Sequence, residues 1–193
     1  SASRPQTSSA TRRLPASWVR MMAARPLVRR SGRRKPPARR PAPLVFDLVV
    51  EAGDWPSPRT LKVHVARALE AACRKVRPPA GAELAVTFTD DAHIRVLNRQ
   101  FRRRDRETDV LSFPAGPAGS ALLGDIVIAE ETVAREAKEQ GISRNDHLIH
   151  LIVHGFLHLL GHDHEVEAEA LAMERLETAI LRSVGITDPY MDR

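Results

Sequence analysis

The chain has 193 residues, of which 42% are hydrophobic, and a formal net charge of +6. This length suits one domain with its own core, and no apolar run approaches the roughly 20 residues that a transmembrane helix needs. The single cysteine, Cys73, excludes an intramolecular disulfide and indicates a reducing compartment. We therefore expect a cytoplasmic protein with no part in a membrane.

The positive charge is concentrated at the N-terminus. Residues 1–43 hold 12 Lys and Arg and no acidic residue, which leaves 18 basic against 24 acidic residues in the remainder. A segment this rich in Arg, Pro, Ala and Ser buries too little apolar surface to fold. We predict a disordered basic extension over residues 1–43 and a folded domain over 44–193. The extension suits an RNA-binding arm, a dispensable tail, an organelle transit peptide or an upstream translation start.

The domain is predicted to mix strands and helices. Strands are predicted from β-branched or alternating runs over residues 44–50, 83–89, 109–113 and 122–128. Helices are predicted from composition and apolar spacing over residues 61–76, 91–100, 129–140, 147–160 and 166–184. Asp90 and Ser143 are expected to cap the second and fourth helices. The last two strands are separated by a turn, so they are expected to pair as an antiparallel hairpin.

The histidine-rich segment 154–164 has the spacing of a metal site. His154 and His158 are four residues apart, so their imidazoles lie on one face of a helix. Gly161 can end the helix in a left-handed conformation and turn the chain so that His164 reaches the same ion. Three protein ligands leave the fourth position of a tetrahedral zinc open, as in catalytic sites. The alternative, a helix merely rich in histidines, explains any one histidine better than it explains the triplet.

The residues around this triplet refine the prediction. The helix over residues 147–160 is apolar almost all round apart from its histidines, so it should lie centrally in the fold. His162 is not expected to be a ligand, and Asp163 either orients an imidazole or stabilises the turn. The spacing is similar to that of a zinc-protease motif, in which a glutamate directly after the first histidine is the general base. Gly155 stands at that place here, so a peptidase would lack its base.

A cluster of arginines precedes the third predicted strand. Its members are Arg102, Arg103, Arg104 and Arg106. Guanidinium groups near an open metal position suit a phosphodiester, because the planar fork can bind two phosphate oxygens at once. The alternative is a solvated basic loop that is balanced by the neighbouring acids Asp105, Glu107 and Asp109.

Three segments together resemble the YbeY-type endoribonucleases, the rRNA maturation factors. They are His-Gly-Phe-Leu-His-Leu-Leu-Gly-His-Asp-His at 154–164, Phe-Arg…Asp…Thr-Asp-Val-Leu-Ser-Phe-Pro at 101–114 and Gly-Asp-Ile at 124–126. The likeness covers about residues 44–190, including Gly-Ile-Thr-Asp-Pro-Tyr at 185–190. Many members have a small residue where this chain has Arg103, and the basic extension is no part of the family pattern.

The resemblance implies an α+β domain with a small mixed sheet of about four strands flanked by helices, with a central metal-binding helix. It implies a zinc ion held by His154, His158 and His164, and a catalytic role for Arg102. Arg103 and Arg104 are expected to help bind the substrate. The implied activity is cleavage of single-stranded RNA in 3′-end maturation of small-subunit rRNA and in ribosome quality control. The implied partners are rRNA, the small ribosomal subunit and ribosome-associated assembly proteins.

A mechanism follows as a hypothesis. The metal would polarise a phosphodiester oxygen or lower the pKa of water, and Arg102 would neutralise the developing charge. The proton acceptor stays open between hydroxide, a nearby histidine such as His150, and the RNA. Two other functions stay open: a non-catalytic ribosome assembly factor with a structural zinc, and a hydrolase acting on peptides or small esters. Three imidazoles also accommodate nickel, copper or iron.

Overall fold

The computed structural model describes residues 43–117, 119–162, 167–187 and 189–190. The predicted N-terminal extension lies almost entirely outside the described residues, so the predicted division at residue 43 stays a prediction. Asp163 and His164 also lie outside the described residues.

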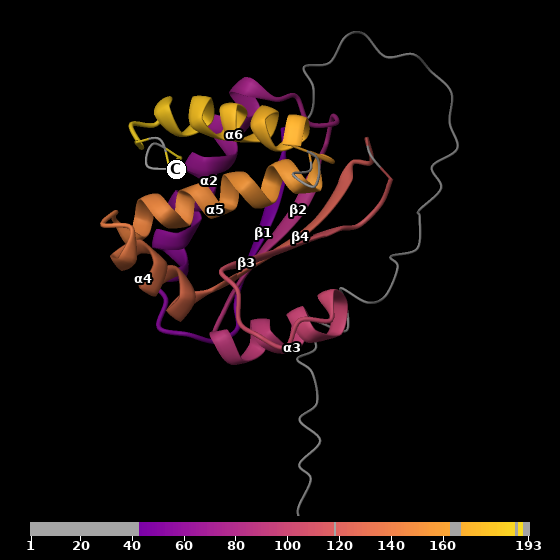
Figure 1. The fold of residues 1–193 in the computed structure, drawn as a ribbon. Helices are drawn as coiled ribbons and strands as arrows, with labels where there is room; N and C mark the ends of the chain where they lie inside the picture. The colour runs from indigo at the N-terminus through magenta and orange to yellow at the C-terminus, as the bar shows by residue number, and fades with distance from the viewer. Residues whose placement is uncertain (1–42, 118, 163–166, 188, 191–193) are drawn as a thin grey trace, which may run out of the picture. The chain divides into compact units, whose positions relative to one another are not determined.

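The described strands form one mixed sheet (Figure 1). Their bounds are Val45–Val50 (β1), Glu83–Thr89 (β2), Val110–Pro114 (β3) and Leu122–Ala129 (β4). The order across the sheet is β1-β2-β4-β3, with β2 parallel to both β1 and β4, and β3 antiparallel to β4. The predicted hairpin and the predicted mixed sheet are confirmed.

Helices cover both sides of this sheet. Their bounds are Pro58–Lys75 (α2), Asp91–Arg102 (α3), Glu130–Glu139 (α4), Arg144–Leu159 (α5) and Glu167–Arg182 (α6). Figure 1 shows α2, α5 and α6 on one side of the sheet and α3 on the other. None of the described helices is long and apolar enough to cross a bilayer. The arrangement of these helices on a mixed sheet confirms the α+β class predicted from the sequence.

Two helices begin earlier than predicted. The first predicted helix starts at Pro58, because the Ser57 side chain accepts a backbone hydrogen bond from the first turn and proline suits the first helical position. The helix that carries the histidines starts at Arg144. Its predicted cap is confirmed, since Ser143 Oγ accepts a 3.0 Å hydrogen bond from the backbone N–H of Asp146.

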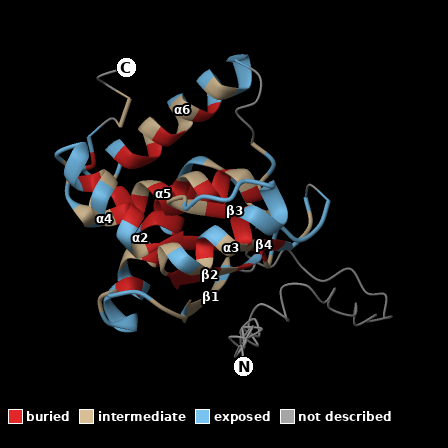
Figure 2. Cartoon of the chain, turned by 60° about the horizontal axis from the view of Figure 1, so that its bottom comes forward, coloured by how far each residue is buried: buried red, intermediate tan, exposed pale blue. Residues whose placement is uncertain are grey.

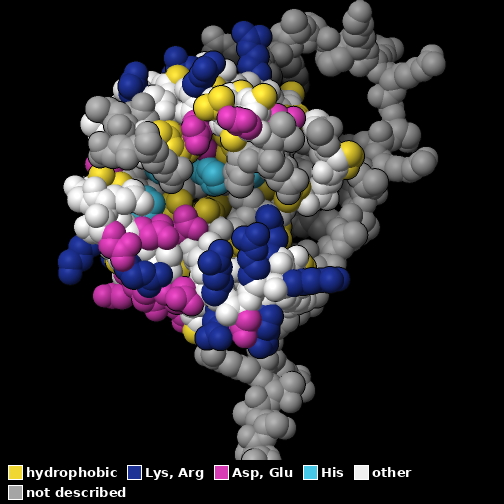
Figure 3. Space-filling model, viewed as in Figure 1, with side chains coloured by type: hydrophobic (Ala, Val, Ile, Leu, Met, Phe, Trp, Pro, Cys, Tyr) yellow, Lys and Arg dark blue, Asp and Glu magenta, His cyan; other side chains and the backbone are white. Residues whose placement is uncertain are grey.

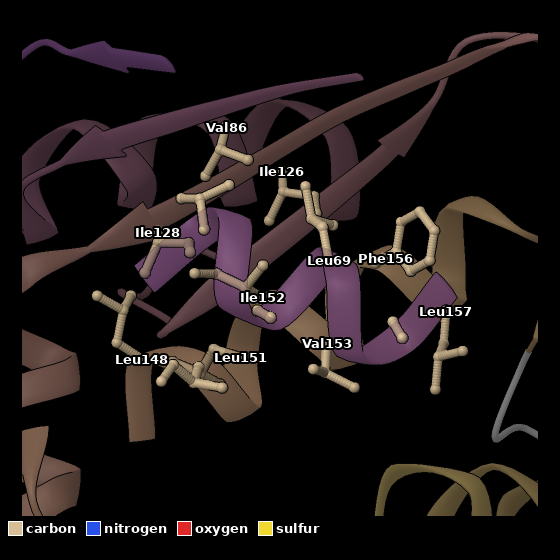
Figure 4. Close-up of a cluster of buried hydrophobic side chains, with 14 of the residues drawn as sticks. Leu69, Val86, Ile126, Ile128, Leu148, Leu151, Ile152, Val153, Phe156 and Leu157 are labelled. Atoms are coloured by element: carbon tan, nitrogen blue, oxygen red, sulfur yellow. The ribbon is translucent and has the colours of Figure 1, made fainter. Parts of the chain in front are cut away.

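Helix α5 lies at the centre of the folded part, as its apolar sequence predicted. It contacts β3, β4, α2, α4 and α6, and Figure 2 shows that it is largely buried. Ile152 and Phe156 are fully buried in the same core cluster as Leu69 of α2 and Ile126 of β4 (Figure 4). This packing fixes the helix on the sheet, so side chains on its remaining face hold a defined position.

Gly155 lies where α5 packs tightly against the sheet. A Cβ atom at this position would lie 2.9 Å from Ile126 Cγ2 and 3.0 Å from Ser112 Oγ. The Ser112 hydroxyl donates a 3.3 Å hydrogen bond to the Gly155 carbonyl. A glutamate here would be driven into the sheet instead of toward the histidines. The general base of the zinc proteases is therefore missing for a packing reason.

Candidate metal centre

Two histidines on α5 converge as metal ligands do. The Nε2 atoms of His154 and His158 lie 3.1 Å apart, and the two rings are tilted by 78°. Two imidazole nitrogens on one tetrahedral zinc, each at about 2.0–2.1 Å, are about 3.3 Å apart. The spacing of the pair therefore fits a shared ion. Both side chains are partly accessible, so an ion between them would face the surface.

The chain turns directly after the second histidine. Gly161 has a φ of 90°, and its N–H donates to the His158 carbonyl at 3.0 Å. The His162 N–H donates to the Leu157 carbonyl at 3.1 Å, which completes a Schellman motif. The predicted left-handed helix end is confirmed, and it lies where the chain must turn for His164 to approach the pair.

His162 does not complete the site. Within the described ranges, which omit residues 163–166, no three His, Cys, Asp or Glu side chains are placed to hold a metal ion. That His162 is not a ligand stays a prediction, because the segment that follows it lies outside the described residues. His164 as third ligand and Asp163 as its orienting neighbour stay predictions, because both lie outside the described residues.

A buried carboxylate contacts the first histidine of the pair. Glu177 on α6 is 0% exposed, and its Oε1 accepts a 2.8 Å hydrogen bond from His154 Nδ1. Its Oε2 faces His150 Nε2 at 3.4 Å and accepts a hydrogen bond from the Tyr190 hydroxyl. Burial by itself raises the pKa of Glu177, but the hydrogen bonds from His150, His154 and Tyr190 hold the pKa below its ordinary range. The side chain is thus an ionised acceptor.

Glu177 was not predicted from the sequence, although the sequence carries a signal for it. The other buried residues of α6 are Met173, Ile180 and Leu181, which recur at helical spacing. Glu177 lies in the middle of this apolar stripe. A glutamate at such a position predicts a buried carboxylate with partners, because an unpaired one is costly.

His150, one of the three proton acceptors that the sequence left open, has both ring nitrogens in the interior of the fold. Its Nε2 faces Glu177, and its Nδ1 is buried without a hydrogen-bond partner among the described residues. These contacts favour water or the RNA over His150 as the proton acceptor, and the choice stays a prediction.

Arg102 is linked to the histidine helix through the edge strand β3. Arg102, the last residue of α3, donates from Nη2 to the Ser112 carbonyl of β3 at 3.4 Å. Ser112 in turn bonds to Gly155, the residue after His154. In Figure 3, a group of Lys and Arg side chains lies on the same face as the histidines. Arg102 is exposed, so its guanidinium can also meet a ligand from solution.

The loop after α3 is held by one buried side chain. Asn98 is 3% exposed, and its amide donates to the Arg106 carbonyl at 2.8 Å. The backbone carbonyl of Asn98 accepts a 3.3 Å hydrogen bond from the backbone N–H of Arg104. Arg103 lies between them as the C-cap of α3, with a left-handed φ of 59°. This loop therefore has a defined backbone path, although its arginine side chains are exposed.

The neighbouring acids do not neutralise the arginines next to the site. Asp105 pairs with Arg95 at 2.9 Å, and this hydrogen bond lowers the pKa of Asp105. Asp109 Oδ1 accepts hydrogen bonds from Thr108 and from the backbone of β3. In the part of the chain that the structure describes, no carboxylate lies within ion-pair distance of Arg102, Arg103 or Arg104. Positive charge therefore remains available for an anion.

The fold and the site define an α+β protein whose central helix presents a histidine pair beside a basic loop. The family model of Endoribonuclease YbeY matches residues 52–185. The chain belongs to the YbeY endoribonuclease family.

Several relatives share the name Endoribonuclease YbeY. The protein from Chelativorans sp. (strain BNC1) is 52% identical over 150 residues, which cover 75% of this chain and 92% of that protein. The protein from Rhodopseudomonas palustris is 51% identical, over 75% of this chain and 80% of its own length. The protein from Rhizobium meliloti is 46% identical, over 78% of this chain and 96% of its own length. The solution structure of TM1509 from Thermotoga maritima is 24% identical, with a TM-score of 0.49 over 76% of this chain and 99% of that chain.

Proposed function

We propose that this protein is a zinc-dependent endoribonuclease that cleaves single-stranded RNA in the 3′-end maturation of small-subunit rRNA. Membership of the YbeY endoribonuclease family supports the cleavage of RNA. The observation that carries the metal-dependent part is the 3.1 Å approach of the two Nε2 atoms of His154 and His158. In ribosome quality control, the same RNA cleavage would act on the rRNA of defective subunits.

The zinc ion is held in this proposal by His154, His158 and His164. The two described ligands fit the ion in spacing, and because the Nδ1 of His154 is bonded to Glu177, its Nε2 is the nitrogen turned toward His158. The turn at Gly161 supports the third ligand, because it reverses the chain directly after His158. When bound, the ion supplies Lewis-acid polarisation of the phosphodiester.

The protein's own residues bind and orient the RNA. Arg102 neutralises charge on the scissile phosphate, with Arg103 and Arg104 binding the adjoining backbone. Phe101 is 43% exposed and packs edge-on against Phe113, with the ring centroids 5.1 Å apart. An exposed aromatic ring beside a cation suits the stacking of an unpaired base. Because Gly155 offers no proton acceptor, we propose that the proton released during cleavage is accepted by water or by the RNA.

The setting follows from the substrate. We propose rRNA and the small ribosomal subunit as partners, together with ribosome-associated assembly proteins, in the cytoplasm. Cys73, the only cysteine, is free, and partial burial raises the pKa of its thiol. This state suits a reducing compartment.

The proposal predicts that His158→Ala loses both the metal and the activity. Cleavage of a short single-stranded RNA should fall at least about 1000-fold, since the ion supplies several kcal/mol of transition-state stabilisation. The measurement is the zinc content of the purified protein together with the cleavage rate of an end-labelled RNA. Wild-type protein should leave casein intact.

His162→Ala is the matched control, because it removes a neighbouring imidazole that is not a ligand in this proposal. It should keep zinc and cleavage at wild-type levels. Full RNA cleavage by metal-free His158→Ala would contradict the proposal. Zinc-loaded wild-type protein that cuts no RNA would instead favour an assembly factor with a structural metal.

A further inference from the structure

Glu177 is a fully buried carboxylate with no role in the binding of RNA. It lies on α6, across from the histidine face of α5, and its two oxygens face different partners. One oxygen accepts from His154 Nδ1 at 2.8 Å, while the other meets His150 Nε2 and the Tyr190 hydroxyl. The carboxylate is thus held from two sides, and its orientation is fixed.

We propose that Glu177 is a positioning residue that keeps His154 in the tautomer able to bind the metal. A neutral imidazole carries one N–H, and a carboxylate at Nδ1 keeps the proton on that nitrogen. The lone pair is then on Nε2, the atom that lies 3.1 Å from His158 Nε2. Glu177 therefore sets both the ring angle and the donor atom of His154.

A purely structural role explains this arrangement poorly. The neighbours of Glu177 in the buried stripe of α6 are Met173, Ile180 and Leu181, so an apolar residue would continue the stripe. Buried charges seldom add stability over well-packed apolar groups. Retaining an ionised side chain at this position makes sense if it serves the imidazole that it contacts.

Tyr190 acts through Glu177 and not on the substrate. Its hydroxyl donates to Glu177 Oε2, the oxygen that is not used by His154. The ring of Tyr190 also lies nearly perpendicular to that of His150, with centroids 6.0 Å apart. The segment after α6 is thereby tied to the back of the metal centre, and Tyr190 restrains the carboxylate that holds His154.

The test uses Glu177→Gln, which preserves size but removes the charge. This inference rests on the proposed metal site, so the readouts are zinc affinity and the tautomer of His154 in the metal-free protein. We expect zinc affinity, measured by competition with a chromogenic chelator, to fall about 10- to 100-fold. We also expect ¹⁵N chemical shifts to show His154 protonated at Nδ1 in the wild type and mixed between the two nitrogens in the variant.

Glu136→Gln is the matched control. Glu136 Oε2 of α4 pairs at 3.0 Å with Nε2 of His147, which lies on α5 about two turns before His154. It should leave zinc affinity and the His154 tautomer unchanged. Tyr190→Phe serves if Glu177→Gln does not fold, and it should weaken zinc binding by less than about tenfold.

The outcomes separate the positioning role from the metal site itself. Unchanged zinc affinity and an unchanged tautomer in Glu177→Gln would overturn the role of Glu177, even if the wild type binds zinc and cleaves RNA. An equal loss of affinity in Glu136→Gln would also overturn it, because the effect would then be general loosening. A wild-type protein that binds no zinc would contradict the proposed metal site, whereas the tautomer readout would still report on Glu177.

Discussion

Arg102→Gln should lower the rate of RNA cleavage about 100- to 1000-fold while leaving the zinc content unchanged. Loss of one fixed donor that meets developing negative charge has an effect of this size. Arg102 is the arginine that contacts Ser112, next to the backbone of the histidine helix. The measurement is single-turnover cleavage of a short RNA by zinc-loaded protein, with metal content determined on the same sample.

Arg103→Gly is the comparison that separates the two adjacent arginines. Arg103 has a left-handed φ of 59°, which a residue with a Cβ adopts at a cost of about 1 kcal/mol. Glycine should therefore raise the free energy of unfolding by about that amount, while cleavage stays within a few-fold of wild type. Loss of cleavage in Arg103→Gly with full cleavage in Arg102→Gln would transfer the catalytic role to Arg103.

Gly124→Ala should lower the free energy of unfolding by about 3–5 kcal/mol, since overpacking and backbone strain each cost about 1–3 kcal/mol. Gly124 has a φ of 131°, and a Cβ there would lie 2.1 Å from the Phe113 carbonyl oxygen. The clash is with backbone, so no side-chain movement relieves it. It also falls on the β3–β4 pairing that places Ser112 beneath Arg102. Urea unfolding followed by circular dichroism measures the change.

Gly141→Ala isolates the steric part of this effect. Gly141 also has a left-handed φ, of 66°, but nothing lies within 4 Å of the position of its Cβ. Only the backbone conformation is penalised there, so the loss should be about 1 kcal/mol. Equal losses in the two variants would mean that β3 and β4 do not approach as closely as described.

Local patterns were enough to predict the helices and strands and the end of the histidine helix. The alternation of residues 83–89, the caps at Asp90 and Ser143 and the left-handed Gly161 all depend on a few neighbouring residues, and each is confirmed. The histidine helix is apolar on nearly all its faces, and this correctly predicted that it lies at the centre of the fold. These features follow from the sequence because propensity and burial act over short stretches.

The features that were missed depend on contacts between distant segments. Glu177 meets His154 across 23 positions of sequence, and no local pattern joins a carboxylate of the last helix to that histidine. Gly155 was noticed only as the place of a missing glutamate. Its packing against Ile126 and Ser112 required the arrangement of α5 on the sheet. The link from Arg102 to Ser112 depends on the same arrangement.

The central claim is that three imidazoles share one metal ion and leave one position open. X-ray absorption spectroscopy of the zinc-loaded protein tests it most directly, because it counts and identifies the ligands. We predict three imidazole nitrogens at about 2.0–2.1 Å and one further light atom that is not from the protein. The count should fall by one imidazole in His164→Ala. Four protein ligands in the wild type, or a count unchanged by His164→Ala, would contradict the account.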